Sequence, residues 1–204
     1  MKIRTEARRQ AILAAAAKLF REVGYERASM NELAKRHGGS KATLYGYFES
    51  KEALFVAVVR ASSTAHLTEA IKELDVDAEG ADALQSTLLR FAERMLTVLA
   101  NDESAIELYR VVVAEAKHSG VGEMFLDAGP VEAHAALARF LSRAMRRGDV
   151  REMNAKLLAM QFTSLVVAEA QTRILERDPK PLTASQIRKA ASRAVDVFFN
   201  GVGA

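Results

Sequence analysis

Two short helices separated by a tight turn are predicted between residues 29 and 48, and this spacing constrains the fold more than any other feature of the chain. Ser29 followed by Glu32 has the pattern of a capping box, which begins a helix. The segment 37–39, His-Gly-Gly, ends that helix, and Ser40 is placed to cap the next one. Two helices joined by about three residues that include glycine have the spacing of a helix-turn-helix motif.

A longer amphipathic helix is predicted before this motif. From Arg9 to Val23 the apolar residues recur at steps of three and four, and Gly24 follows as a helix-ending residue. Residues 1–9 hold four basic residues and are expected to form a flexible arm. Packing of the three helices predicts a small core, made of Ile12, Ala16, Leu19, Phe20, Met30, Leu33, Leu44 and Phe48. Because about 50 residues make a marginal core, a fourth helix that begins after Ser50 is expected to join this bundle to the remaining chain.

The rest of the chain is also predicted to be helical, without the alternation of a strand. After the fourth helix, at 51–74, and an acidic loop, helices are expected over the ranges 81–100, 102–118, 122–147, 151–176 and 184–200, with Pro130 breaking the third of these. The predicted fold is all-α with about nine helices. Residues 1–50 form the helix-turn-helix domain, 51–74 the connector, and 75–204 a helical regulatory and dimerisation domain.

Composition narrows the function classes. The chain has no cysteine, which excludes disulfides, thiol nucleophiles and thiolate metal sites and suits a reducing cytosol. Residues 1–60 carry twelve Lys or Arg against six Asp or Glu, whereas residues 61–204 carry seventeen against twenty. A basic first third on an acidic remainder favours a polyanion-binding module at the N-terminal end. The chain carries no phosphate-loop, dinucleotide, metalloprotease or serine-hydrolase motif.

The outward face of the helix that starts at residue 41 is unusual for a solvated surface. On a helical wheel Leu44 and Phe48 point inward, while Ala42 and Gly46 point outward. Thr43 and Tyr45 flank this small-residue strip, and Lys41 and Tyr47 can reach around it. Small residues flanked by hydroxyl groups and a lysine suit a helix that lies close in a DNA major groove. Lys51, at the start of the following helix, adds a charge for a phosphate.

The segment "ILAAAAKLFREVGYERASMNELAKRHGGSKATLYGYFESKEALF" resembles the N-terminal domain of TetR-family transcriptional regulators. The resemblance implies that Ser29 and Met30 open the first helix of the motif and that residues 40–48 form the recognition helix. It implies DNA contacts for the residues Ser29, Met30, Ser40, Lys41, Ala42, Thr43, Tyr45, Tyr47 and Lys51. Two departures stand out. The turn usually reads Ala-Gly-Val-Ser but is His37-Gly38-Gly39-Ser40 here, so a small core contact is lost, and a larger DNA-contacting residue often stands at Gly46.

The segments "RVVVAEAKHSG", "MFLDAGPVEAHAALARFLSRAMRRGDV" and "AVDVFFNGVG" resemble the regulatory domain of an AefR-like branch of the same family. This resemblance implies a helical ligand-binding domain and a homodimer. Candidate pocket residues are His66, Phe91, Met95, Tyr109, Met124, Phe125 and Phe162; plain core packing is the competing interpretation. The last two helices are apolar on more than one side, which predicts a four-helix dimer interface, against a monomeric core. Candidate interface residues are Phe162, Val166, Ile174, Ile187, Ala191, Val195 and Phe198.

Together these features predict a cytoplasmic, ligand-responsive, DNA-binding transcriptional regulator that is not an enzyme. It is expected to repress transcription by binding a palindromic operator in double-stranded DNA as a homodimer, and to be released by a small, largely apolar effector. No cofactor, metal ion or membrane association is expected. The alternative is a helical interaction module whose helix-turn-helix no longer binds DNA specifically; the Gly-rich turn and Gly46 favour that interpretation.

Overall fold

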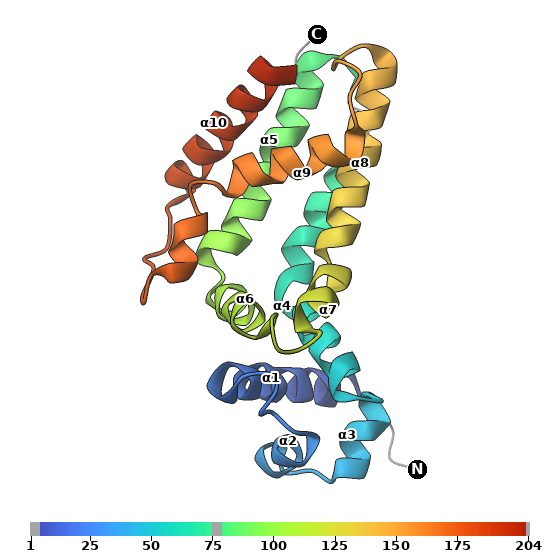
Figure 1. Ribbon diagram of the computed structural model, residues 1–204, viewed down its shortest axis with the longest axis vertical. Coiled ribbons are helices and arrows are strands. Elements are labelled where there is room, and N and C mark those ends of the chain that lie inside the picture. The colour runs from blue at the N-terminus through green and yellow to red at the C-terminus, as the bar shows by residue number, and fades with distance from the viewer. Residues whose placement is uncertain (1–4, 75–78, 203–204) are drawn as a thin grey trace. The chain divides into compact units, whose positions relative to one another are not determined.

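The computed structural model describes residues 5–74 and 79–202, and their regular secondary structure is helical (Figure 1). The side chains of residues 63–69 and 202 lie outside the description. The elements are α1 Glu6–Val23, α2 Met30–His37, α3 Lys41–Tyr47, α4 Lys51–Glu73, α5 Ala81–Asn101, α6 Glu103–Glu115, α7 Val121–Ala128, α8 Pro130–Arg147, α9 Ala155–Val167, the 3-10 helix η1 Gln171–Leu175 and α10 Ala184–Val202. The predicted all-α class is confirmed, and the described residues hold no β-strand.

Side-chain oxygens cap the first turn at the helix starts that the sequence predicts. Ser29 Oγ accepts the amide hydrogen of Glu32 at 3.1 Å, and the caps by Ser40 and Ser50 are also present. The capping box is only half formed, because the Glu32 carboxylate binds Arg36 in the next turn. The first helix begins earlier than predicted, at Glu6, since Thr5 acts as its cap. The arm predicted for residues 1–9 is therefore helical from residue 6 onward, and residues 1–4 lie outside the described residues.

One predicted helix is broken in the structure. The range 151–176 was expected to be continuous, but α9 begins after the Asn154 cap, ends at Val167, and is followed by η1. Contacts from distant residues hold the segment after α9: the Arg173 guanidinium donates to the Ala100 carbonyl at 3.4 Å, and Asn101 exchanges two 2.8 Å hydrogen bonds with the Leu182 backbone. The break at Pro130 is as predicted, and it separates α7 from α8.

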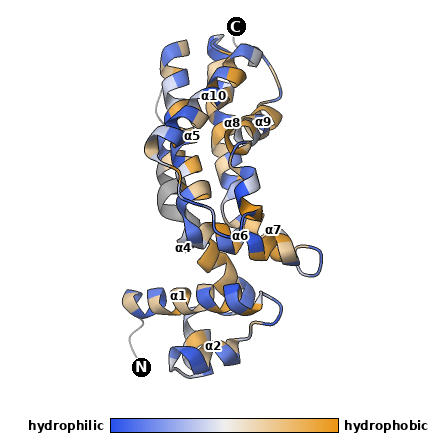
Figure 2. Ribbon diagram, turned by 90° about the vertical axis from the view of Figure 1, so that its left-hand side faces the viewer, coloured by the Kyte–Doolittle hydropathy of each residue, from blue (hydrophilic) through white to orange (hydrophobic). Residues whose placement is uncertain are grey.

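The chain forms two compact units, Met1–Thr64 with Ser104–Gly129 and Ala65–Glu103 with Pro130–Ala204. This division differs from a cut at residue 75, because α6 and α7 pack with α1–α3 and the first part of α4. All eight residues of the predicted bundle core are buried, as are Leu108 and Val112 of α6 in the same core. Figure 2 shows apolar and polar residues interleaved along α1 and α10, as expected for helices that bury one side.

The second unit packs α5, α8, α9 and α10 around the buried rings of Phe91, Phe140 and Phe162. The C-terminal end of α4 belongs to it and is held by two arginines of α5. Glu73 accepts hydrogen bonds from Arg90 and Arg94 of α5, at 2.8 and 2.6 Å. Among the described residues, no helix is long and apolar enough to cross a membrane.

The turn after α1 depends on a glycine and on a carboxylate from α6. Gly24 has φ of 81°, and a Cβ added there would lie 2.1 Å from Glu115 Oε1. The other carboxylate oxygen, Oε2, accepts the amide hydrogen of Glu26 at 2.8 Å. Glu115 thus fills the space that a side chain at position 24 would need, and it holds the loop that leads into α2.

We expect Gly24→Ala to lower the free energy of unfolding by about 2–3 kcal/mol, because it adds a clash to the backbone strain of a positive φ. Gly38→Ala is the matched control: Gly38 has φ of 71°, and nothing lies within 4 Å of an added Cβ. Gly38→Ala should lower the free energy of unfolding by about 1 kcal/mol, the cost of the positive φ alone. Urea unfolding followed by circular dichroism measures both, and equal losses would contradict a role for Glu115. In a Glu115→Ala background the loss from Gly24→Ala should fall but stay above that of Gly38→Ala, because Gly24, with ψ of 167°, has a backbone conformation open almost only to glycine, whereas Gly38, with ψ of 31°, lies in the left-handed helical region.

Candidate nucleic-acid interface

The short helix α3 is held by its cap and by two buried side chains. Ser40 Oγ accepts the Thr43 amide hydrogen at 3.1 Å, and the two hydroxyl oxygens lie 2.9 Å apart. Leu44 and Phe48, one turn apart, are buried in the core of the first unit as predicted. These contacts fix which side of α3 faces outward.

The outward side of α3 carries small and polar residues. Lys41 and Ala42 are exposed, and Tyr45 is 43% exposed. The Lys41 ammonium lies 5.7 Å from the centre of the Tyr45 ring, a cation–π contact that leaves the charge at the surface. Gly46 is half-buried, and because it has no side chain it adds no bulk to this side. The arrangement offers a surface with small side chains, one cation and the hydroxyl groups of Thr43 and Tyr45.

Three residues predicted to contact DNA either bind other residues of the protein or are buried. The hydroxyl of Tyr47 accepts the amide hydrogen of Thr5 at 3.0 Å and so joins α3 to the start of α1. The Lys51 ammonium donates to the Tyr25 carbonyl at 3.1 Å and lies 4.2 Å from the centre of the Tyr25 ring. The Met30 side chain is buried in the core, which leaves only its backbone available for DNA. Ser29 is exposed while it caps α2.

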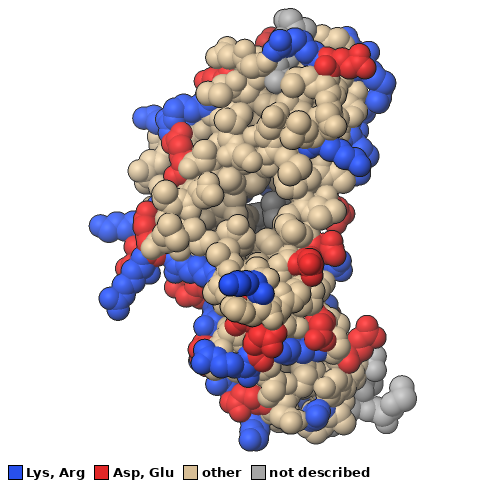
Figure 3. Space-filling model, viewed as in Figure 1, with Lys and Arg blue, Asp and Glu red and all other residues tan. Residues whose placement is uncertain are grey.

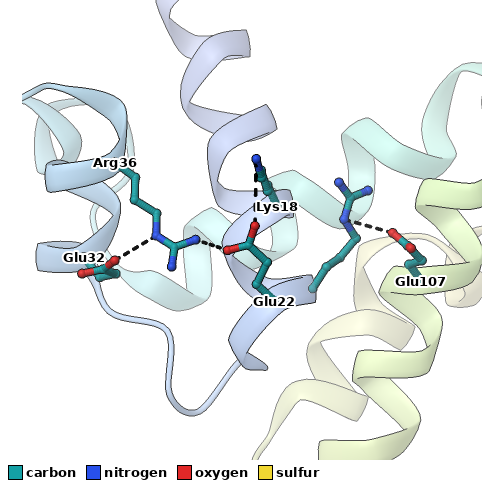
Figure 4. A network of polar contacts seen from close by, with 6 residues as sticks. Lys18, Glu22, Glu32, Arg36 and Glu107 are labelled. Carbon is teal, nitrogen blue, oxygen red and sulfur yellow. Dashed lines mark hydrogen bonds and ion pairs between the residues drawn. The ribbon is translucent and has the colours of Figure 1, made fainter.

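The helix α2 is fixed to α1 by ion pairs (Figure 4). The Arg36 guanidinium binds Glu22 of α1 and donates to Glu32 of its own helix at 2.8 Å. On the other side of α1, Arg21 pairs with Glu107 of α6 at 3.0 Å. All these side chains are partly exposed, so each pair alone adds little stability, but together they set the orientation of α2 and α6 against α1.

Tyr25, which the sequence reasoning did not single out, is the centre of the loop between α1 and α2. Its ring lies 5.7 Å from that of Phe20 and 5.0 Å from that of Phe55, measured between ring centres. The hydroxyl donates to Glu52 Oε1 at 3.2 Å. Burial first, and the Glu52 carboxylate second, raise the pKa of Tyr25 far above its ordinary value. The phenol therefore stays protonated as a donor, and the Gly-Tyr pair after α1 is the sequence signal that marks it.

The candidate pocket residues fall in both compact units. Phe91 and Phe162 lie in the core of the second unit with ring centres 6.3 Å apart, and Met95 packs against that core. In the first unit the rings of Tyr109 and Phe125 lie 5.4 Å apart, with Tyr109 42% exposed. Met124 packs against the core of that unit, and the His66 side chain lies outside the described residues.

Most of the candidate interface residues are used inside the second unit itself. Phe162, Val166, Ile187, Ala191, Val195 and Phe198 are buried in its core, and Ile174 is half-buried. The exposed apolar residues of the same helices are different ones: Leu157 and Met160 of α9 and Val197 of α10. The two helices thus carry apolar residues both on the side that faces the core and on the side that faces outward. Figure 3 shows an uncharged area over α9.

Among the described residues no cluster of histidine and carboxylate side chains could hold a metal ion. His134 instead makes a hydrogen bond to Thr163, with Nε2 and Oγ1 3.0 Å apart. Because Thr163 donates its own hydrogen to the Met160 carbonyl at 2.9 Å, the imidazole is the donor in this contact.

Comparisons with known proteins match both parts of the chain. The family described as "Bacterial regulatory proteins, tetR family" matches residues 12–58, and that described as "AefR-like transcriptional repressor, C-terminal domain" matches residues 86–201. The uncharacterized HTH-type transcriptional regulator Rv2250c of Mycobacterium tuberculosis is 28% identical over 172 residues, which cover 82% of this chain and 80% of that protein.

Two solved structures extend the likeness over nearly the whole chain. A TetR-family transcriptional regulator from Mesorhizobium loti has a TM-score of 0.78 at 23% identity, with 100% of each chain covered. The flavonoid-responsive regulator FrrA has a TM-score of 0.74 at 28% identity, with 98% of each chain covered. With a helix-turn-helix in α2 and α3 and a family match over more than half its length, the chain belongs to the TetR family of ligand-responsive, DNA-binding transcriptional regulators.

Proposed function

We propose that this protein is a transcriptional repressor that binds a palindromic operator as a homodimer through the outward side of α3. The observation that carries the proposal is that side itself, where exposed Lys41, Ala42 and Tyr45 lie together with no acidic residue of α3 among them. A solvated helix surface rarely lacks carboxylates, whereas a helix in the major groove needs small side chains and donors. The match to a repressor C-terminal domain supports repression.

The assignment makes the protein a DNA-binding regulator of the bacterial cytoplasm with no catalytic activity. The alternative is a helical module that no longer reads DNA, favoured by the Gly38-Gly39 turn and Gly46. A mobility shift with the intergenic DNA upstream of the protein's own gene separates the two. Saturable binding of a palindromic segment that weakens with salt supports the regulator, because phosphate contacts release counterions. Binding no stronger than to random DNA, here and after selection from random sequences, would favour the interaction module.

Lys41→Ala is expected to weaken operator binding and to reduce the slope of log K against log salt concentration by about 0.9 for each protomer on the DNA. Lys189→Ala is the matched control, since it removes the same charge from an exposed position on α10. The salt titration compares wild type and both variants. An equal slope for Lys41→Ala and wild type would exclude a phosphate contact by Lys41.

The homodimer is proposed to form on the outer apolar side of α9 and α10. Leu157, Met160 and Ser164 follow one another at helical spacing on α9, and their side chains are exposed. Val197 adds an exposed apolar residue on α10. Two copies that pair these helices would form a four-helix interface, as a two-fold operator requires.

Met160→Glu is expected to raise the dimer dissociation constant about a hundredfold, because an unpaired carboxylate buried in an apolar interface costs about 3 kcal/mol. Val131→Glu makes the same change at a residue that is 52% exposed, against 53% for Met160, but on α8. Analytical ultracentrifugation over a concentration series measures both. Equal dissociation of the two variants would rule out this side of α9.

The effector is proposed to be a small, planar and largely apolar molecule that packs on the Tyr109–Phe125 pair. Val113, one turn after Tyr109 on α6, is also exposed and extends the apolar surface. The exposed ring of Tyr109, beside the half-buried ring of Phe125, suits a planar ligand, since stacking and burial act together. The responsiveness of FrrA to flavonoids supports a ligand of this shape.

A panel of flavonoid aglycones tests the effector. A member of the panel should raise the melting temperature of the protein and release it from the operator. Tyr109→Ala should weaken its binding about tenfold, because it removes one ring of the stacking pair. Tyr45→Ala is the control, with a tyrosine of almost equal exposure outside α6 and α7, measured by melting temperature without DNA. No effect of any compound in the panel would contradict this ligand class.

A further inference from the structure

The turn between α2 and α3 contains Gly39 where the TetR-family pattern that this segment resembles usually has valine, and an arginine from α1 lies against it. A Cβ added at Gly39 would lie 3.5 Å from one terminal nitrogen, Nη2, of Arg8 and 3.7 Å from the His37 ring. A methyl group fits at that distance, whereas the two further methyl groups of valine leave less room for the guanidinium. Arg8 therefore lies in the space that a valine side chain would take.

The Arg8 guanidinium has no partner among the described residues. Its Nε is buried and makes no hydrogen bond, although the residue as a whole is half-buried. An unpaired, partly desolvated cation lowers the stability of the free protein, so its position calls for a compensating interaction. The neighbouring Arg9 differs, because its guanidinium lies 3.7 Å from the Glu6 carboxylate and 5.5 Å from the centre of the Phe48 ring.

Arg8 also lies at the edge of the candidate nucleic-acid interface. One helical turn before it, the amide of Thr5 donates to the Tyr47 hydroxyl at the end of α3. Directly after Gly39 come Ser40 and Lys41, both exposed. The first turn of α1 is thus held against the helix proposed to enter the groove, and its free cation stands beside that helix.

We propose that Gly39 makes room for the Arg8 guanidinium and that this group binds a phosphate of the DNA backbone. A phosphate is the fitting ligand, because the planar fork of arginine pairs with two of its oxygens and neutralises the unpaired charge. Arg8 thus adds, from α1, a phosphate contact beside the Gly-rich turn. The inference rests on the proposed function, since it assumes that α3 lies on DNA.

The test is a salt titration of operator binding with Arg8→Ala, Gly39→Val and Gly39→Ala. Arg8→Ala should reduce the salt slope by about 0.9 for each protomer on the DNA. Gly39→Val should reproduce that loss with Arg8 still present, because it displaces the guanidinium. Gly39→Ala should keep the wild-type slope. Gly39→Val added to Arg8→Ala should have no further effect on the slope.

Lys18→Ala is the charge-matched control on the same helix, where Lys18 is exposed and paired with Glu22 at 4.0 Å. An unchanged slope for Arg8→Ala, or an equal loss for Lys18→Ala, would overturn the proposal, as would a wild-type slope for Gly39→Val with normal folding by circular dichroism. If the wild-type protein binds no DNA, the proposed function fails together with this inference. If the wild type binds and Arg8→Ala binds with an unchanged slope, only the inference fails.

Discussion

The Tyr25 ring makes the packing contacts on which the DNA-binding unit depends. It lies against Phe20 at the end of α1 and against Phe55 in α4, and its hydroxyl donates to Glu52. Its carbonyl accepts from Lys51, so side chain and backbone are both fixed by the first turns of α4. Residues 20–25 and 51–55 thus meet at one ring, and the path of the loop into α2 follows from it. The orientation of the helix-turn-helix is therefore set by α4 as much as by its own turn.

The excess of basic residues in the first 60 positions overstates the charge available for DNA. Arg21 and Arg36 are paired with carboxylates of neighbouring helices, and Lys51 is bound to a backbone carbonyl. These cations hold the bundle together, although each partly exposed ion pair contributes little to stability. Lys41 has no carboxylate partner among the described residues. A net charge read from sequence thus locates a polyanion-binding unit, and only the geometry shows which cations are left over for the polyanion.

Helix positions and the small core of the first unit could be predicted, because caps, glycine stops and apolar spacing act locally. The ends of α9 could not, since nothing in its sequence marks Val167 as an end and the segment after it is held from α5 through Asn101. The same limit applies to surfaces. An apolar helix predicts burial, but sequence alone does not tell whether Phe162 or Leu157 faces the protomer's own core.

The division into compact units explains why a regulatory region and a DNA-binding region cannot be separated at one point of the chain. The chain passes between the units at 64–65, at 103–104 and at 129–130. The segment between the last two passages, α6 and α7, supplies Glu107 and Glu115 to α1 and its following loop. The effector proposed for the Tyr109–Phe125 pair would therefore bind to α6 and α7, the segment that also holds α1 and the loop before α2. Such a ligand changes DNA binding only if it binds two arrangements of these helices with different affinity.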